Sequence, residues 1–217
     1  MNENVKLLVF VLCWILLVQI GVGMNRRKMK TIWVIGGPGC GKGTQCDKII
    51  AKYGLLHLSS GDLLREEVAS GSPRGASLQE LMSKGLFVPT DVVLSLIKER
   101  MDKARAEGGT VGFLIDGYPR EKDQGIQFEK DVCPVDIIIA FDVASETMRT
   151  RLLGRAAVSG RADDNEATIA KRIEIFNLKN EEILAHYIDK VVRINAEGTI
   201  DDIFEQVSKA LDPLFVS

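Results

Sequence analysis

The sequence is poor in the residues that build metal centres and disulfide frameworks. Its 217 residues include four cysteines and two histidines, and no two cysteines stand in a C-x-x-C spacing. A structural zinc site is therefore not expected. A disulfide framework is not expected either, so the chain suits a reducing compartment.

An excess of either charge is also missing. The chain carries 28 basic and 30 acidic residues, which gives a net charge of −2 at pH 7. Without a global basic field, nucleic-acid binding is not expected. A hydrophobic fraction of 46% beside 27% charged residues is enough for a packed core and excludes wholesale disorder. The length then indicates one domain with small appendages.

No apolar run reaches the roughly 20 residues of a membrane-spanning helix. The longest covers twelve residues, 7–18, and extends over 7–22 if Gln19 is tolerated, with a basic flank at 26–30. One interpretation is a membrane anchor, whose basic flank would keep the rest of the chain in the cytoplasm. A second is a cleaved secretory signal, whose apolar core has this length, although the residues before it are nearly neutral.

An upstream extension that is absent from the main product is the third interpretation, and we favour it. Met24 and Met29 stand just before the first strand-like run, where translation could start. We therefore divide the chain into an N-terminal extension, 1–29, and a domain that carries the chemistry, 30–217.

Short apolar runs alternate with longer amphipathic stretches after residue 30. The runs lie at 32–35, 113–115, 137–141 and 191–194, with a weaker fifth run at 55–58. Continuous apolar strands are typical of a parallel sheet that is covered on both faces. Apolar residues at helical spacing predict helices within 92–101, 169–187 and 203–214. The alternation predicts a doubly wound α/β fold.

A glycine-rich turn follows the first apolar run. Residues 36–44 read GGPGCGKGT, in which Gly36, Gly41 and Lys42 match the phosphate-loop spacing G-x-x-x-x-G-K, and Gly43 stands where that pattern has Ser or Thr. Glycines let backbone N–H groups converge on phosphate oxygens, and the following helix adds its positive end. Nucleotide binding is therefore predicted, in preference to a turn that is glycine-rich by chance.

Cys40 lies inside this loop. We interpret it as a small side chain that fits the turn. The alternative hypothesis is a reactive thiol at the start of the helix.

Asp116 and a set of arginines extend the phosphate-binding pattern. Asp116 ends the run 113–115, where phosphate-loop enzymes hold magnesium, often through water, although an Asp there can also cap a turn. Two nucleotides that exchange a phosphoryl group repel each other strongly, and arginines offer bidentate contacts that offset the charge. Any one arginine could be a solvated surface residue, but together they indicate a clamp: Arg65, Arg120, Arg155, Arg161 and Arg172.

Six ordered motifs over about 30–211 resemble the adenylate kinase family, specifically the short cytosolic type of animals: GGPGCGKGTQ, HLSSGDLLR, GFLIDGYPR, RLLGR, SGRADDNEATIAKR and INAEG. The resemblance implies a P-loop fold with a five-stranded parallel sheet, a small monophosphate-binding subdomain at about 59–88 and a short lid at about 154–164. It implies the reversible reaction of Mg·ATP with AMP to give two ADP. It also implies a cytoplasmic enzyme with Mg²⁺ as cofactor, and we expect a monomer.

The resemblance also implies residue roles. Catalysis would use Lys42, Asp116, Arg120, Arg155, Arg161 and Arg172. ATP would contact Gly39, Cys40, Gly41, Lys42, Gly43, Thr44, Arg155 and, near its base, Gly198. AMP would contact Ser60, Arg65, Leu86, Phe87, Val88, Gly117, Tyr118, Pro119, Arg120, Gln124, Arg161 and Arg172, with Gln124 reading the adenine edge. The only metal role is that of Asp116, toward Mg²⁺ through water.

Ser60 departs from the family, because the short adenylate kinases usually have Thr at this position. The similar UMP/CMP kinases typically have Ala there and read GFPR where this chain reads GYPR at 117–120. AMP is therefore the expected acceptor, with a UMP/CMP kinase as the first alternative and a non-catalytic nucleotide-binding module as the second. A GTP switch would need N-K-x-D, which the chain lacks.

The roles of two glycines stay open, and the two histidines receive no catalytic role. Gly154 and Gly160 flank the expected lid and could be flexible points or simple turn residues. His57 and His186 are assigned to packing or to the surface.

Overall fold

The computed structural model describes residues 29–84, 86, 88–159, 163 and 165–215, with the side chains of 158–159 excepted. Within these ranges, every helix is too short or too polar to cross a membrane. The apolar segment 7–22 and the site candidates Phe87 and Arg161 lie outside the described residues. Their predicted roles therefore stay predictions.

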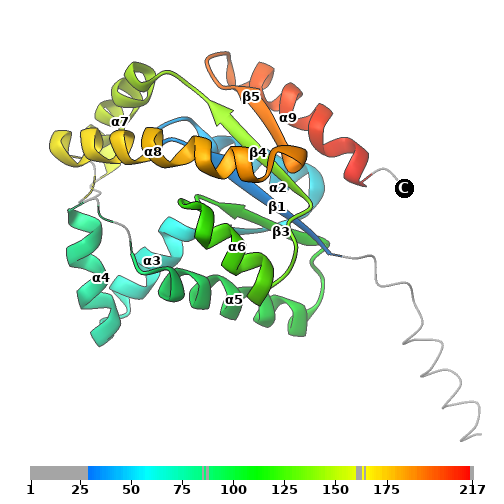
Figure 1. Cartoon of the computed structure of the whole chain (residues 1–217), viewed down its shortest axis with the longest axis horizontal. Coiled ribbons are helices and arrows are strands. Elements are labelled where there is room, and N and C mark those ends of the chain that lie inside the picture. Colours follow the sequence, from blue (N-terminus) through cyan, green and yellow to red (C-terminus); the bar gives the residue numbers. More distant parts are fainter. Residues whose placement is uncertain (1–28, 85, 87, 160–162, 164, 216–217) are drawn as a thin grey trace, which may run out of the picture.

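Five parallel strands form the predicted sheet. They are β1 (Lys30–Gly36), β2 (Leu56–Ser59), β3 (Gly112–Asp116), β4 (Ile137–Asp142) and β5 (Val191–Asn195). Their order is β2-β3-β1-β4-β5, so the chain starts in the middle and fills one side before the other (Figure 1). Ligands of such sheets bind at the carboxyl ends of the strands where the order reverses, which here is the end of β1.

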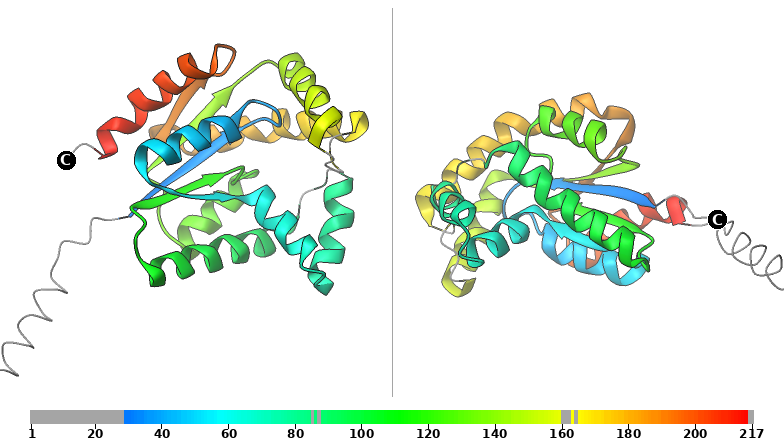
Figure 2. Two further views of the ribbon diagram at one scale, coloured as in Figure 1. Left: turned by 180° about the vertical axis from the view of Figure 1, so that it is seen from behind. Right: turned by 90° about the horizontal axis from the view of Figure 1, so that it is seen from below.

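The two faces of the sheet carry separate hydrophobic layers, because successive side chains of a strand point to opposite sides. In β1, Trp33 and Ile35 pack into one layer, and Ile32 and Val34 pack into the other. Helices α2 (Lys42–Tyr53) and α9 (Ile200–Phe215) cover the second layer and lie in front of the sheet in the left view of Figure 2.

The first layer is covered by helices that connect β2 to β3, β3 to β4 and β4 to β5. These are α3 (Ser60–Ala69), α5 (Thr90–Glu107), α6 (Lys122–Asp131) and α8 (Glu166–His186), which is followed by the short helix η1 (Ile188–Lys190). The doubly wound architecture predicted from the apolar runs is confirmed.

Helix α4 (Pro73–Ser83) packs closely on α3, and the two helices together form most of the segment expected to be a small subdomain. A Cβ atom at Gly75 would lie 2.5 Å from the carbonyl oxygen of Glu67, so only glycine permits this approach. Ser72 caps α4 by accepting a hydrogen bond from the N–H of Gly75. This region is therefore held by local packing as well as by the sheet.

Helix α7 (Ser145–Ser159) runs into the expected lid of about 154–164, whose bounds stay a prediction. Gly154 lies inside this helix and is therefore not a turn residue. Helix α8 begins at Glu166, and the side chain of Asn165 caps it by accepting from the N–H of Thr168. A small cluster of Met148, Leu152, Ile169 and Ile173 packs α7 against α8.

Candidate active site

A cavity of about 650 Å³ opens at the carboxyl ends of β1, β2 and β3. It brings together the following predicted site residues: Gly39, Gly41, Lys42, Gly43, Thr44, Ser60, Arg65, Leu86, Val88, Asp116, Gly117, Pro119, Arg120, Arg155 and Arg172. Cys40, Tyr118, Gln124 and Gly198 are described but do not line it. Segments that are far apart in the sequence thus line one cavity, and the roles predicted for these residues stay predictions.

The loop between β1 and α2 is shaped by its glycines. Gly39 has a φ of +78°, and a Cβ atom there would lie 2.8 Å from both the Leu152 side chain and the Met148 carbonyl oxygen. Gly41, with a φ of +95°, precedes the first residue of α2 and offers no side-chain cap. The first N–H groups of α2 are therefore left for a ligand, which suits an anion such as phosphate.

Lys42 folds back across this loop. Its Nζ donates hydrogen bonds to the carbonyl oxygens of Gly36, at 2.7 Å, and Gly37, at 2.9 Å. The ammonium group is thus held at the loop by two neutral backbone acceptors. A phosphate oxygen carries more charge than these carbonyls and would make a stronger hydrogen bond with the same donor.

Cys40 is packed rather than presented to the cavity. Its side chain is 2% exposed, and its Sγ lies 3.6 Å from the Nζ of Lys42. A Cβ atom at Gly36 would come within 2.7 Å of the same Sγ. These contacts favour the interpretation of a small side chain that fills the loop.

Asp116 ends β3 directly beside β1, in register with Val34. Its Oδ1 is buried and has no hydrogen-bond partner among the described residues, while its Oδ2 lies 3.6 Å from the Nε2 of His57. A buried carboxylate oxygen without a partner is costly, and a bound cation removes that cost. Thr44 lines the same cavity, so the side chains present include the oxygen donors that Mg²⁺ prefers.

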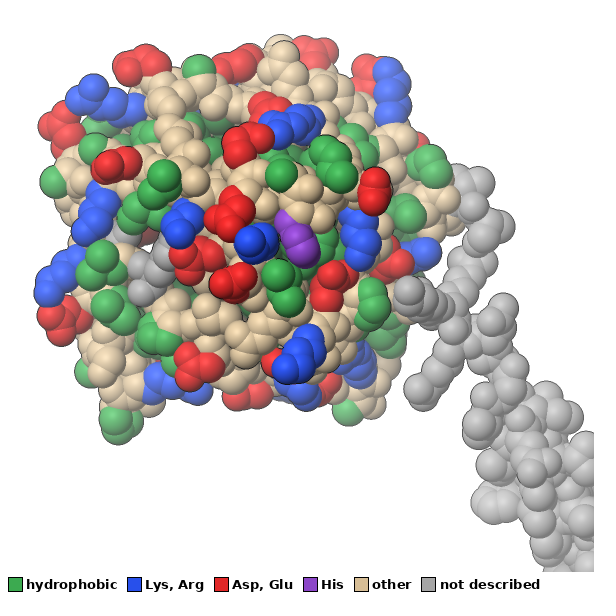
Figure 3. All heavy atoms as spheres, in the orientation of Figure 1, with side chains coloured by type: hydrophobic (Ala, Val, Ile, Leu, Met, Phe, Trp, Pro, Cys, Tyr) green, Lys and Arg blue, Asp and Glu red, His purple; other side chains and the backbone are tan. Residues whose placement is uncertain are grey.

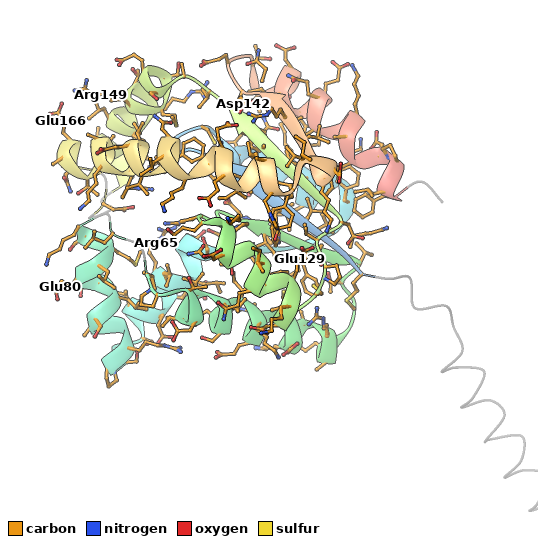
Figure 4. The ribbon with its side chains drawn as sticks, viewed as in Figure 1. Arg65, Glu80, Glu129, Asp142, Arg149 and Glu166 are labelled. Carbon is orange, nitrogen blue, oxygen red and sulfur yellow. The ribbon has the colours of Figure 1, made fainter. Side chains whose placement is uncertain are left out.

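The arginines reach the cavity from α3, from the turn after β3, from α7 and from α8. Arg65 projects from α3 on its side toward α8 and pairs with Asp62 (Figure 4). Arg120 follows β3, and its Nε donates to the carbonyl oxygen of Gly117 at 3.1 Å. Arg172 on α8 pairs with Asp163 at 2.7 Å.

Arg120 lies in the cavity together with other arginines and with several carboxylates. Burial lowers the pKa of the Arg120 guanidinium group, and the positive charges of Arg172 and Arg65 lower it further. The negative charges of Asp116 and Asp163 act in the opposite direction and raise it. The group stays charged because arginine titrates far above neutral pH. Mutual repulsion of this kind is relieved when an anion binds among the arginines.

Hydrogen bonds hold the turn after β3, which lines the cavity. Ser60 is 2% exposed, and its Oγ donates to the carbonyl oxygen of Gly117 at 2.8 Å. The Oε1 of Gln124 accepts from the N–H of Arg120 at 2.9 Å, and the hydroxyl group of Tyr118 donates to the Gln124 carbonyl oxygen at 2.7 Å. Gln124 and Tyr118 therefore support the turn, and the adenine-reading role of Gln124 stays a prediction.

Arg151, the first residue of the RLLGR motif, lines the cavity although no site role was predicted for it. Its NH1 donates to the Cys40 carbonyl oxygen at 3.3 Å, and its NH2 donates to the Ala196 carbonyl oxygen at 3.2 Å. It ties α7 to the phosphate loop and to the end of β5. Its position four residues before Arg155 places both on one helix face, which is the sequence feature that could have indicated it.

A different arginine of α7 makes an ion pair outside this site. Arg149 pairs with Glu166 and joins α7 to the start of α8 (Figure 4). Neither residue lines the cavity.

A phosphate loop at the switch point of a parallel sheet, opposite a group of arginines, defines a P-loop nucleoside monophosphate kinase. The family model described as adenylate kinase matches residues 34–192. The chain therefore belongs to the adenylate kinase family, and it is an enzyme that transfers a phosphoryl group between nucleotides.

Curated relatives agree with this assignment. The chain is 58% identical to adenylate kinase isoenzyme 1 of Caenorhabditis elegans over 182 residues, which cover 83% of this chain and 86% of the relative. It is 54% identical to adenylate kinase 1 of Schistosoma mansoni over 186 residues, 85% and 93% of the two chains. It is 49% identical to adenylate kinase isoenzyme 1 of Homo sapiens over 190 residues, 87% and 97%. Nothing in these comparisons favours the UMP/CMP kinase alternative.

Proposed function

We propose that this chain catalyses the reversible transfer of the γ-phosphoryl group of Mg·ATP to AMP, which gives two ADP. The arrangement of the cavity is the observation that carries the proposal. The phosphate loop, Lys42 and Asp116 line it together with arginines of α3, of the turn after β3, of α7 and of α8. One cavity thus offers separate cationic groups for two phosphorylated ligands.

On the donor side, the phosphate loop holds ATP. Backbone N–H groups of residues 39–44 and the start of α2 bind the phosphates, and Lys42 exchanges the carbonyl oxygens of Gly36 and Gly37 for phosphate oxygens. Arg155 and Arg151 approach the same nucleotide from α7. Gly198, in the loop after β5, is proposed to approach the base.

Mg²⁺ would be held with the nucleotide by Asp116, through water, and by Thr44. When bound, it neutralises the phosphate charge that otherwise repels the second nucleotide. Asp116 is fixed for this role by the strand pairing of β3 with β1.

On the acceptor side, residues 59–88 and the turn after β3 hold AMP. Arg65 and Arg120 bind its phosphate group, and Leu86 and Val88 line its pocket. The hydrogen bond from Ser60 to Gly117 keeps the turn before α3 and the turn after β3 at a fixed separation. Orientation of the acceptor oxygen toward the γ-phosphoryl group supplies much of the rate enhancement.

Three arginines surround the phosphoryl group during transfer, Arg155, Arg161 and Arg172. They come from α7, from the segment between α7 and α8, and from α8. Completing this set only when both nucleotides are bound keeps water from acting as the acceptor. The segment of about 154–164 is the proposed lid.

The proposal extends to the setting of the enzyme. We propose a monomer that works in the cytoplasm, without a nucleic-acid partner. The cysteines that the structure describes are free, and Figure 3 shows basic and acidic side chains interspersed over one face of the molecule. Residues 7–22 remain a candidate membrane anchor on sequence grounds alone.

The test compares two lysines of the same helix. Lys42→Met should lower kcat for ADP formation from ATP and AMP by about 100-fold or more, because a charged group at the transferring phosphates is lost. Lys48→Met removes an exposed lysine that pairs with Asp201 and should leave kcat within about twofold. Equal rates for the two folded variants would contradict the proposal.

A further inference from the structure

Three metal-ligating side chains meet beneath the phosphate loop. Cys46 comes from α2, His57 from β2 and Asp116 from the end of β3, and their ligand atoms all lie within 4.8 Å of one another. We refer to Cys46, His57 and Asp116 as the Cys–His–Asp cluster. The phosphate-transfer scheme uses Asp116 but gives no role to the other two.

Strand geometry explains why the three side chains converge. Asp116 lies two residues after Leu114 on β3, so the two side chains point to the same face of the sheet. Leu114 packs in the layer that also holds Cys46. Leu56 and Leu58, the neighbours of His57, pack in the opposite layer, so His57 faces the α2 side. The cluster therefore lies where α2 crosses the ends of β2 and β3.

The cluster contains polar atoms that the rest of the protein leaves unused. The Nε2 of His57 and the Oδ1 of Asp116 are buried, and neither has a hydrogen-bond partner in the described part of the chain. The distance of 3.6 Å between His57 Nε2 and Asp116 Oδ2 is longer than an ordinary hydrogen bond. Buried polar atoms without partners call for an explanation, and an ion bound between them is one.

We propose that the Cys–His–Asp cluster binds a single Zn²⁺ ion. One thiolate, one imidazole nitrogen and one carboxylate oxygen form a ligand set that zinc accepts, with bonds of about 2.0–2.3 Å. At those bond lengths, tetrahedral ligand atoms lie about 3.3–3.8 Å apart, so the present spacing needs a contraction of only about 1 Å. On binding, the Cys46 thiol releases its proton to solvent.

The cavity supplies both access and the fourth ligand. His57 and Asp116 line it, whereas Cys46 is fully buried behind them. A water molecule from the cavity completes the coordination. The thiolate ligand selects zinc over Mg²⁺, which prefers oxygen ligands.

Zinc in this position inhibits the enzyme. The ion recruits Asp116, which the proposed function assigns to the magnesium of the bound nucleotide, and it ties α2 to β2 and β3. The inhibition rests on the proposed function, whereas the binding of the ion does not.

Binding is tested on the nucleotide-free full chain with Co²⁺ as a spectroscopic probe. One equivalent of Co²⁺ should give a sulfur-to-metal charge-transfer absorption that Zn²⁺ removes. Cys46→Ser should lose this band, and His57→Gln should weaken Co²⁺ affinity by about tenfold or more. The matched control, Cys13→Ser with Cys133→Ser, keeps the cluster and should keep the band.

Two results would overturn the binding proposal. One is the absence of the band in the unchanged chain, which would leave the three side chains as a packed polar cluster only. The other is a band that persists in Cys46→Ser. If Cys46→Ser does not fold, Cys46→Ala provides the same test with a side chain suited to the apolar layer around α2.

Inhibition is tested separately, in ADP formation from Mg·ATP and AMP with free Zn²⁺ held constant by a metal buffer. Each variant is normalised to its own zinc-free rate. The control with Cys13 and Cys133 replaced should be inhibited like the unchanged chain, and Cys46→Ser should need about tenfold more zinc or higher. If zinc inhibits Cys46→Ser and the unchanged chain at the same concentration, the proposed inhibition is overturned. If the unchanged chain forms no ADP without zinc, the proposed function is overturned instead.

Discussion

The two sides of the cavity are built by different means. On the proposed donor side, backbone atoms form most of the site. Gly39 fits against α7 with no room for a Cβ atom, and Lys42 is held by two loop carbonyl groups. On the acceptor side, Arg65 and Arg172 are charged side chains that already pair with carboxylates. In the proposed function, one nucleotide thus enters a preformed backbone cradle and the other replaces the carboxylate partners of the arginines.

This difference has a consequence for mutations. Changes in the backbone cradle should affect folding and nucleotide binding together. Changes in the arginines should lower turnover far more than stability. The partly exposed Arg65–Asp62 pair contributes only about 0–1 kcal/mol to stability, and the Arg172–Asp163 pair, which is less exposed, contributes more.

Arg172→Ala should give the largest effect on turnover. Loss of a guanidinium group at the transferring phosphoryl group should lower kcat by about 1,000-fold, as for arginines that stabilise phosphoryl-transfer transition states. Steady-state kinetics and thermal unfolding would be measured side by side. Arg149→Ala is the control, because Arg149 pairs with Glu166 outside the cavity; a comparable loss in this control would show that the arginines act through folding.

Gly39→Ala should destabilise the protein. Its φ of +78° and the 2.8 Å approach to the Met148 carbonyl oxygen both oppose a Cβ atom, so we expect the free energy of unfolding to fall by about 2 kcal/mol or more. Denaturant unfolding measures this change. Gly43→Ala is the matched control, since no described atom lies within 4 Å of the added Cβ atom.

The control should behave in the opposite way. In Gly43→Ala the free energy of unfolding should stay constant or rise by about 0.5–1 kcal/mol, because alanine is the better helix residue. The KM of Gly43→Ala for ATP should rise, because the added methyl group would occupy the open space at the phosphate loop where the ATP phosphates are proposed to bind. Equal destabilisation by the two changes would contradict the backbone account of the donor side.

Ser60→Ala should have a smaller effect on stability. The carbonyl oxygen of Gly117 would lose the hydrogen bond from Ser60, which costs about 1 kcal/mol. The KM for AMP should rise while the KM for ATP stays constant. Ser60→Thr keeps the hydroxyl group and should keep both values; a rise in the ATP value alone would assign Ser60 to the wrong side of the cavity.

The smallest effect concerns the pH dependence of α3 and α4. Hydrogen bonds from Arg74 and then Ser72 lower the pKa of Glu67 from 4.5 to about 2. Because the folded pKa lies below the unfolded one, the stabilisation is present above pH 4.5 and is lost as the pH falls toward 2. The Tm difference between the unchanged chain and Glu67→Gln should be constant above that range and vanish near its lower end. A difference that stays constant down to the lower end would contradict the assignment.

The backbone side of the site could be predicted from the sequence far better than the side-chain side. Apolar runs and glycines specify local backbone geometry, so the strands, the phosphate loop and the placement of Asp116 followed from local patterns. The helical state of Gly154 did not, because a glycine followed by an arginine is compatible with a turn, a flexible point or a helix interior, and here it lies inside α7.

Partners of individual side chains depend on which strand faces which helix, and no local pattern contains that information. The hydrogen bonds of Arg151 to the phosphate loop and of Gln124 to Arg120 are examples. The Cys–His–Asp cluster is another, since its ligands come from three segments and lack the short spacing of a metal-binding motif.

The most direct measurement of the central claim is a comparison of AMP, UMP and CMP as acceptors for ATP in the purified full chain, with each nucleoside diphosphate quantified. The account predicts that AMP is the preferred acceptor by kcat/KM, that two ADP form for each ATP consumed, and that the reaction runs in reverse from ADP. A kcat/KM for UMP or CMP equal to or above that for AMP, or hydrolysis of ATP without phosphorylation of AMP, would contradict it.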